Sequence, residues 1–329
     1  MVHSLSHEKN KSLQNLVLQP NIFYVTIIVT EFGVYGGYAM TKKKKIALFV
    51  FLGILVFLIA FLIWGNKSLE SNNYTVTHKD IPNSFDGFRI VQVSDLHNTQ
   101  IGINNRRLIK SLKKAEPDII VITGDLIDNR RTDVEVALDF TKEAVKIAPC
   151  YYITGNHEPL VPEEYEVLKS AMIEQGVTVL ENDSRYIEKD GERIRISGLD
   201  DPFAHSMKEY EHLHSEYSYT HLYLITELEK LGDDDCYTVL LGHRPEYFDY
   251  YVDCGAELVL SGHAHGGQIR IPYVGAIYIP YQGFMPKYDE GVFTEENTTM
   301  IISRGIGNSQ IPIRIFNRPE ILTIELKSE

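Results

Sequence analysis

Two histidines that flank a single alanine, His263 and His265, follow directly after a short apolar run. The run, residues 257–260, is typical of a buried strand, and Gly262 and Gly266 allow the chain to turn tightly beyond it. On an extended segment, residues two apart point to the same side, so both imidazoles could face neighbouring metal ions. The alternative is a turn with two surface histidines, because a His-x-His pattern alone is a weak signal.

Four further apolar runs end in turns of the same kind, which are rich in Asp, Asn, His and Gly. The runs span residues 90–93, 119–123, 151–154 and 237–241. The polar residues that follow them are Asp95, His97, Asp125, Asp128, Asn156, His157, Glu158 and His243. In open α/β sheets, ligands bind at the carboxyl ends of the strands. Because all five runs carry potential ligands at their carboxyl ends, the sequence predicts one shared site.

Helical segments follow the first three of these runs. Residues 104–115, 133–147 and 163–175 carry apolar side chains at helical spacing and end near a proline or a glycine. This alternation of strand and helix is typical of parallel βαβ units. Short alternating runs within residues 177–197 instead predict antiparallel strands. Further strands are expected over residues 268–271, 276–279, 299–303 and 321–326. The order predicts an α/β fold in which two packed sheets carry helices on their outer faces.

The five turn motifs resemble those of a known family. They read, in order, D-x-H, G-D-x-x-D, G-N-H-E, G-H and G-H-x-H, and this set resembles the calcineurin-like metallophosphoesterase family. The resemblance covers residues 85–329. Segments 261–272 and 303–307 are similar to its bacterial, membrane-associated branch of YaeI- and YkuE-like phosphodiesterases. The resemblance implies a four-layer αββα sandwich with a dinuclear metal centre that hydrolyses phosphate esters.

The resemblance also assigns each ligand to one of two divalent metal ions. Asp95, His97 and His265 would bind one ion, Asn156, His243 and His263 would bind the other, and Asp125 would bridge them. Carboxylate, imidazole and amide ligands suit Mn²⁺ first, with Fe or Zn²⁺ as alternatives. Two such ions about 3.5–4 Å apart would hold a bridging hydroxide that attacks the phosphorus. Because only two ligands are carboxylates, the centre stays positive and attracts an anionic phosphate.

Other residues of the same motifs have expected roles around the metals. His157 is expected to be catalytic, because a tight turn after Asn156 could place its imidazole beside the leaving-group oxygen. Asp128 and Glu158 are expected to orient His157 or a ligand imidazole, or to be carboxylates favoured at a helix N-terminus. Arg304 could hold a phosphate that does not react, or could form a structural ion pair. The candidates for substrate binding are Asn98, Gln268 and Arg304.

Composition limits the classes of partner. The chain has 329 residues and a net charge of −13, and residues 70–329 hold 25 basic and 43 acidic residues, a net charge of −18. Such a domain repels nucleic acid, so no nucleic-acid partner is expected. Three cysteines without a C-x-x-C pattern predict neither a disulfide framework nor a zinc–thiolate site. The expected substrate is a phosphorylated small molecule, lipid or cell-wall polymer, and the expected state is a monomer.

An apolar segment near the N-terminus predicts a membrane anchor. Residues 46–64 contain no charge and no proline, four lysines precede them, and Trp64 closes the segment. The lysines should remain in the cytoplasm, which places the rest of the chain outside. A cleaved signal peptide is the alternative, but the run is long and no A-x-A pattern follows it. The predicted parts are a cytoplasmic segment (1–45), a single transmembrane signal anchor (46–64), a linker (65–84) and an extracytoplasmic metallophosphoesterase domain (85–329) at the cell membrane.

Three segments have looser interpretations. Residues 1–39 are interpreted as an extension from a misassigned start codon, and the linker could include an entry strand at 73–77. Residues 203–235 predict a helical insertion near the cleft. Its histidines fit no single metal site, so they are expected at the surface, with a substrate-recognition lid as the alternative. They are His205, His212, His214 and His221.

The expected function is a membrane-anchored, metal-dependent phosphoesterase that acts on phosphodiesters, or on phosphomonoesters. One alternative is a pyrophosphatase that acts on nucleotide-linked or lipid-linked diphosphates, such as UDP-diacylglucosamine-like substrates. Another is a binding module that keeps the fold without catalysis. No ligand position of the five motifs has been lost, and this favours an enzyme.

Overall fold

A computed structural model describes residues 40–203, 216–231, 235–308 and 312–329. The chain divides into two units, Met1–Ile59 and Ala60–Glu329. Helix α2 (Lys42–Lys67) begins in the first unit and ends in the second. Across the described ranges it is the one helix long and apolar enough to cross a membrane, with a mean hydropathy of 3.3 over its apolar window. The helix is longer at both ends than the predicted segment 46–64. At its N-terminal end it includes the four lysines, which are good helix formers. The interpretation of residues 1–39 concerns a segment outside the described residues.

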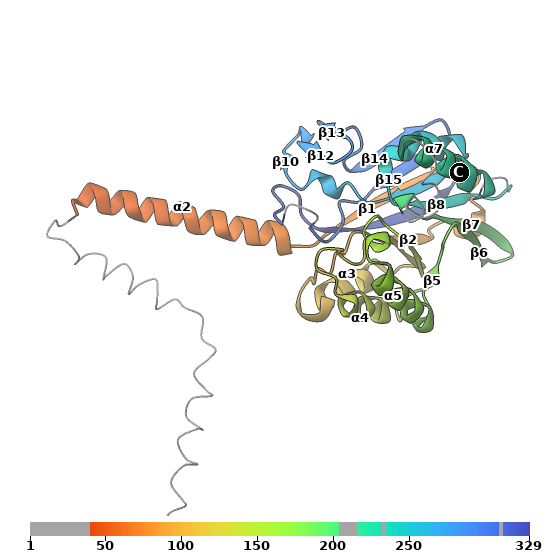
Figure 1. The fold of residues 1–329 in the computed structure, drawn as a ribbon, viewed down its shortest axis with the longest axis horizontal. Helices are drawn as coiled ribbons and strands as arrows, with labels where there is room; N and C mark the ends of the chain where they lie inside the picture. The colour runs from red at the N-terminus through yellow and green to blue at the C-terminus, as the bar shows by residue number, and fades with distance from the viewer. Residues whose placement is uncertain (1–39, 204–215, 232–234, 309–311) are drawn as a thin grey trace, which may run out of the picture. The chain divides into compact units, whose positions relative to one another are not determined.

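Two six-stranded sheets form the centre of the second unit, with strand orders β1-β16-β2-β3-β4-β5 and β14-β15-β9-β8-β7-β6 (Figure 1). The first sheet contains β1 (Glu70–His78), β16 (Glu320–Ser328), β2 (Arg89–Val93), β3 (Ile119–Thr123), β4 (Cys150–Ile153) and β5 (Thr178–Val179). The second contains β14 (Gly291–Glu295), β15 (Thr298–Ile302), β9 (Leu258–Ser261), β8 (Thr238–Gly242), β7 (Glu192–Leu199) and β6 (Asp183–Lys189). Strands such as β3 and β8 are buried throughout and mostly apolar because both faces of the sheet are covered.

Three hydrophobic cores separate four layers. Leu108, Phe140 and Leu168 belong to the core between the first sheet and its helices. Val121 and Leu260 belong to the core between the two sheets. The third core packs helices onto the second sheet. The helices are α3 (Arg106–Ala115), α4 (Val134–Ala144) and α5 (Pro162–Gln175) on the first sheet, and α7 (Glu216–Leu231) and α8 (Phe248–Asp253) on the second. The predicted αββα sandwich is therefore confirmed.

Smaller elements complete the second unit. Two hairpins pair β10 (Arg270–Ile271) with β11 (Gly275–Ala276), and β12 (Tyr278–Ile279) with β13 (Gly283–Phe284). Short 3-10 turns occur at Asn83–Phe85, Ile103–Asn105, Glu158–Leu160, Pro245–Tyr247 and His265–Gly267. Three of these turns follow the ligand-bearing strands β4, β8 and β9, and they redirect the chain at the site.

The strands that carry the five motifs meet at one edge of the sandwich. Strands β2, β3 and β4 are parallel neighbours in the first sheet, and β8 and β9 are parallel neighbours in the second. Buried hydrogen bonds join the two edges. The Gln92 amide donates to the Ser261 carbonyl at 2.8 Å, and Nδ1 of His243 lies 2.7 Å from the Thr123 carbonyl. The turns after the five strands therefore face a common space.

The structure differs from the sequence predictions at several elements. The possible entry strand at 73–77 is confirmed as strand β1, which is longer, Glu70–His78, and pairs in parallel with β16, so the catalytic unit begins before residue 85. Strand β5 pairs in parallel with β4, whereas antiparallel strands were expected there. Helix α7 confirms the helical insertion, and His221 is exposed, with Nδ1 2.7 Å from the Tyr250 hydroxyl. The other three histidines of the insertion lie outside the described residues.

Candidate metal centre

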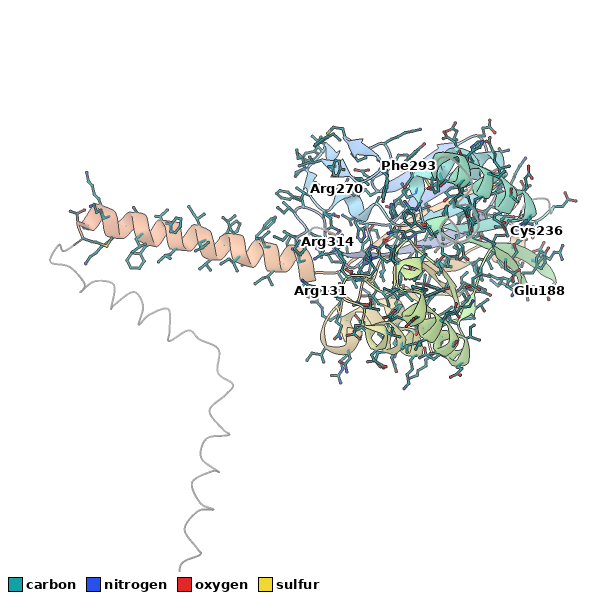
Figure 2. The ribbon with its side chains drawn as sticks, viewed as in Figure 1. Arg131, Glu188, Cys236, Arg270, Phe293 and Arg314 are labelled. Carbon is teal, nitrogen blue, oxygen red and sulfur yellow. The ribbon has the colours of Figure 1, made fainter. Side chains whose placement is uncertain are left out.

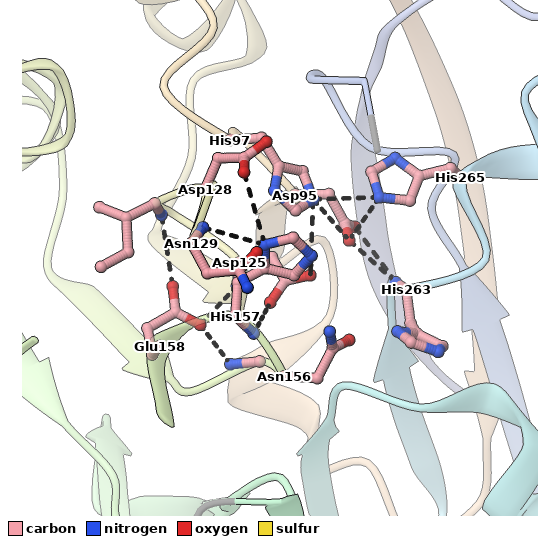
Figure 3. Close-up of polar contacts among 12 residues, drawn as sticks. Asp95, His97, Asp125, Asp128, Asn129, Asn156, His157, Glu158, His263 and His265 are labelled. Atoms are coloured by element: carbon pink, nitrogen blue, oxygen red, sulfur yellow. Dashed lines mark hydrogen bonds and ion pairs between the residues drawn. The ribbon is translucent and has the colours of Figure 1, made fainter. Parts of the chain in front are cut away.

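The polar residues predicted at the strand ends converge in two buried clusters that share Asp125 (Figure 3). Ligand atoms lie within 4.8 Å of one another in the set Asp95, His97, Asp125 and His265, and in the set Asp125, His243 and His263. Oδ2 of Asp125 lies 3.4 Å from Nε2 of His97 and 3.4 Å from Nε2 of His243. The predicted ligand Asn156 joins the second set, with Oδ1 3.3 Å from Nε2 of His243. Asp125 thus occupies the position that a bridging ligand requires.

The backbone at these positions is unusual. Five of the predicted ligands have left-handed conformations, with φ values of 52° for Asp95, 44° for His97, 53° for Asp125, 64° for His263 and 49° for His265. Such conformations cost about 1–3 kcal/mol each and persist only where the surrounding structure imposes them. Here the parallel strands and the bonds between the loops impose them, which is a common property of functional sites.

Two glycines allow the loops to approach one another. A Cβ added at Gly155 would lie 2.2 Å from Oδ1 of Asp125, and one added at Gly262 would lie 1.9 Å from Oγ of Ser94. The backbone amide of His157 donates to Oδ1 of Asp125 at 2.9 Å, so the G-N-H turn itself fixes the shared carboxylate. A side chain at Gly155 would separate these two loops.

Burial and neighbouring charges shift the pKa values of the ligands in opposite directions. Burial raises the pKa of Asp95 to about 7 and lowers the pKa of His97 to about 3. Burial also opposes the charged form of His243, but Asp125 outweighs this effect and raises the pKa to about 10. Burial likewise opposes ionisation of Asp125, but His243 and His157 hold its pKa well below the usual range. In the metal-free protein, an imidazolium at His243 therefore neutralises the Asp125 carboxylate.

The donor set fits a pair of cations. Nε2 of His97 and Nε2 of His265 lie 3.1 Å apart in a buried space. A cation bound by both nitrogens would stabilise this close approach of two neutral imidazoles. Nδ1 of His97 is buried and forms no hydrogen bond with the described residues, so the contacts of this ring with the site are made through Nε2. Two buried carboxylates, Asp95 and Asp125, also need compensating positive charge. The residues present are thus those that a dinuclear divalent centre needs.

His157 is placed beside both clusters. Its Nδ1 accepts a hydrogen bond from the Asn129 amide at 3.2 Å, which leaves the proton of the neutral ring on Nε2. Nε2 lies 4.0 Å from Oδ2 of Asp125, and the residue lines a cavity of about 130 Å³ next to the candidate ligands. His97, Asp128 and His157 also form a third set within metal-binding distance, so a ligand role for His157 has to be tested.

Asp128 and Glu158 make contacts that were not expected. Oδ1 of Asp128 lies 3.9 Å from Nδ1 of His157, beyond hydrogen-bond distance, and the carboxylate instead binds the Arg130 guanidinium at 2.8 and 3.1 Å. The buried carboxylate of Glu158 accepts backbone amides of Leu126 at 2.7 Å and Gly155 at 2.9 Å. Glu158 therefore joins the G-D and G-N-H loops, and these contacts correct the expectation that it orients an imidazole.

The three predicted substrate-binding residues have different environments. Asn98 lines a cavity of about 470 Å³ together with His97, and its amide donates to the Arg131 carbonyl. Gln268 is buried but lines the small cavity beside His157. Arg304 is mostly buried in ion pairs with Glu70, Glu290 and Glu320. The structural alternative for Arg304 therefore fits, and the expected role in substrate binding is not supported by its contacts.

Two buried arginines were missed by the sequence analysis. Nη1 of Arg244 lies 3.4 Å from Nε2 of His263, and its Nε donates to Asp201 at 2.6 Å. Its position directly after His243 was a signal that could have identified it. Nη2 of Arg314 lies 3.4 Å from Nδ1 of His265, yet Arg314 lies outside all of the motifs in the sequence and had no such signal.

Comparison with known proteins establishes the family. The calcineurin-like phosphoesterase family model matches residues 88–267, and the chain belongs to this family. The metallophosphoesterase YkuE of Bacillus subtilis (strain 168) is 33% identical over 79% of this chain and 86% of its own. The phosphodiesterase YaeI of Escherichia coli (strain K12) is 23% identical over 73% of this chain and 82% of its own. A transmembrane protein with a metallophosphoesterase domain from Danio rerio is 27% identical over 75% of this chain and 55% of its own. The chain is therefore a phosphoric ester hydrolase, as predicted.

Proposed function

We propose that this chain is a membrane-anchored, dinuclear metal-dependent phosphodiesterase. The observation that carries the proposal is the position of Asp125, whose Oδ2 lies at the same distance from a histidine of each cluster. Asp95, His97 and His265 would hold one divalent ion, and Asn156, His243 and His263 the other. When bound, Mn²⁺, Fe or Zn²⁺ ions would neutralise the charge of the phosphate and supply an activated water. The similarity to YaeI supports a phosphodiester substrate.

His157 is the group that we assign to the leaving-group oxygen. The Asn129 amide donates to Nδ1, so Nε2 carries the proton of the neutral ring and can donate a hydrogen bond to the oxygen of the leaving alcohol as negative charge develops on it. Burial of the ring at the wall of the cavity keeps water from competing for this hydrogen bond. A hydrogen-bond donor of this kind typically contributes about 10²–10³-fold to the rate.

Hydrolysis of bis(p-nitrophenyl) phosphate by the full-length protein tests this function. We expect turnover that disappears after chelation, returns with Mn²⁺, and falls about 10²–10³-fold in His157→Ala. The variant should keep the metal content of the wild type, measured by inductively coupled plasma mass spectrometry. His221→Ala is the matched control, because this histidine is exposed on α7, and it should keep the full rate.

Two outcomes would contradict the proposal. Loss of metal in His157→Ala would make this residue a ligand, as its place in the third set allows. Metal bound at both sites without turnover of any phosphate ester would favour the non-catalytic binding module.

A diphosphate substrate is a second candidate. The cavity of about 470 Å³ beside His97 is also lined by Arg130 and Arg131, which could hold a second anionic phosphate. Asp128 already engages Arg130, so Arg131 is the residue to change. If the substrate is a nucleotide-linked or lipid-linked diphosphate, Arg131→Ala should raise KM for a UDP-linked diphosphate and leave KM for bis(p-nitrophenyl) phosphate unchanged.

Anchoring at the cell membrane rests on the composition of α2. Its apolar window has a mean hydropathy of 3.3 and is preceded by four lysines. We propose a single pass with these lysines in the cytoplasm and the catalytic unit outside. The Danio rerio relative is named a transmembrane protein, and this supports attachment to a membrane.

A further inference from the structure

An uncharged surface lies next to the candidate metal centre. Residues 271–286 contain no Asp, Glu, Lys or Arg, although residues 70–329 carry a net charge of −18. Their large side chains are exposed at the two hairpins, and exposure reaches 108% for Tyr273 and 79% for Phe284. We define the apolar rim as Tyr273, Val274, Tyr281, Phe284, Met285 and Phe316, all of which are exposed. A group of exposed large apolar side chains of this kind usually marks a binding face.

Backbone hydrogen bonds hold the rim together as one layer. Ile315, next to Phe316, accepts from Arg270 at 3.0 Å and donates to Gln268 at 3.1 Å. Ile277 donates to the Ile269 carbonyl at 3.2 Å, and Met285 donates to the Ile277 carbonyl at 3.0 Å. The Phe316 loop and both hairpins are therefore fixed side by side.

The turns of the hairpins present aromatic side chains in strained conformations. Tyr273 and Tyr281 have φ values of 68° and 67°, which bulky residues rarely adopt. A polar residue or a glycine adopts these turn conformations more readily, and either would be better hydrated at an exposed position. Aromatic residues at the turns of both hairpins therefore indicate a role at the surface that the fold does not require.

The end of the anchor helix contacts the same layer. The rings of Phe61 and Phe316 lie 5.3 Å apart, and the guanidinium of Arg318 lies 4.7 Å from the Trp64 ring. Asn66 fixes this contact, because its Oδ1 accepts the Arg314 amide at 2.9 Å. An aromatic residue such as Trp64 at the end of an apolar helix belongs at the membrane–water boundary. The rim thus begins where the chain leaves the bilayer.

We propose that the apolar rim rests in the lipid surface of the membrane that holds the anchor. Tyrosine is favoured at this boundary because its ring is apolar and its hydroxyl remains hydrated, and Phe284 and Met285 would reach the acyl chains. The same hairpin forms a wall of the catalytic cavity through Tyr278 and Tyr281, and the Tyr281 ring stacks 6.2 Å from that of His263. Contact with lipid would therefore turn the metal centre toward the membrane surface. The proposal does not depend on the substrate or on catalysis.

Tryptophan quenching by brominated lipid tests the proposal in the full-length protein. The chain has one tryptophan, so Trp64→Phe provides a silent background. One reporter is Phe284→Trp in this background, and the matched control is Tyr186→Trp, an exposed aromatic position on β6. Glu188 on β6 and Arg270 at the base of the first hairpin lie on opposite sides of the catalytic unit (Figure 2). Each variant is reconstituted in phosphatidylcholine vesicles with brominated acyl chains, and its fold is checked by circular dichroism.

We expect quenching of the Phe284→Trp reporter to exceed that of the Tyr186→Trp control severalfold. Equal quenching at both positions, or stronger quenching at position 186, would overturn the proposal. A protein partner or a second copy on the rim would shield the reporter without bringing bromine near it, so an unquenched reporter with blue-shifted emission also overturns it. If Phe284→Trp does not fold, Met285→Trp takes its place with the same expected result.

Discussion

Asp125 determines the chemistry at the scale of single residues. It is buried, and its carboxylate is the one group that both ligand clusters share. In the metal-free protein the nearby imidazoles stabilise its charge, above all His243. Metal ions would take over this role, and protons would leave the site as they bind. The residue scale thus predicts that metal binding and protonation are linked.

We expect metal affinity to fall as the pH decreases. His243, whose pKa is raised to about 10, and Asp95, whose pKa is raised to about 7, both hold protons in the acidic range of the metal-free protein. Each must release its proton to bind an ion, so affinity rises with pH and falls steeply below about pH 7. Calorimetric titration of the metal-free protein with Mn²⁺, in buffers of different ionisation enthalpy, measures both affinity and released protons. A dissociation constant that does not change with pH, without proton release, would contradict this linkage.

At the scale of elements, the loops that follow the strands position the residues of the site. The apolar runs in the sequence predicted β2, β3, β4, β8 and β9, and the turn residues predicted which side chains meet at their carboxyl ends. This prediction was possible because each strand and its turn are recognisable from the local sequence. Parallel strands then place the turns at their carboxyl ends along one edge of the sheet. The role of Glu158 could not be predicted, because its amide partners in the Asp125 loop are more than thirty residues away in the sequence.

Long-range packing explains the other differences from the sequence predictions. Strand β1 extends beyond the possible entry strand at 73–77, and its full length could not be predicted because it pairs with β16 from the far end of the chain. Arg304 lies in a conspicuous motif, yet its partners Glu70 and Glu290 come from distant segments. Arg314 touches His265 across a loop that the motifs do not cover. Contacts of this kind arise from tertiary structure and leave no local signal.

The C-terminal end of α2 also contacts the site. Asn66 binds the backbone of Arg314 at both its amide and its carbonyl, and Arg314 reaches His265. We expect Asn66→Ala to lower the free energy of unfolding by about 1–3 kcal/mol, because buried backbone groups lose their partner. Metal affinity should fall as well. Thermal unfolding and Mn²⁺ titration measure these effects, with Asn297→Ala in the exposed β14–β15 turn as the control. If both variants behave as the wild type, the anchor end does not support the site.

At the scale of the whole molecule, the proposed orientation of the chain in the membrane can be tested. The four lysines at the N-terminal end of α2 predict that the catalytic unit lies outside the cytoplasm. Protease added to intact spheroplasts of an expressing bacterium should therefore digest the catalytic unit, while a cytoplasmic marker protein stays intact. Changing the four lysines to glutamine should increase the protected fraction, because it removes the orienting charges. Full protection of the wild-type domain until the membrane is dissolved would reverse the assigned orientation.

Electron paramagnetic resonance of the Mn²⁺-loaded protein tests the central claim most directly. If Asp125 bridges two ions, the spectrum of the wild type should be that of a spin-coupled manganese pair, with two ions per chain. In Asp125→Asn the coupled signal should disappear, and affinity for both ions should fall by more than about 100-fold, beyond the usual effect of a residue outside the ligand set. An uncoupled six-line spectrum from the fully loaded wild type, or a coupled pair that persists in Asp125→Asn, would contradict the dinuclear centre.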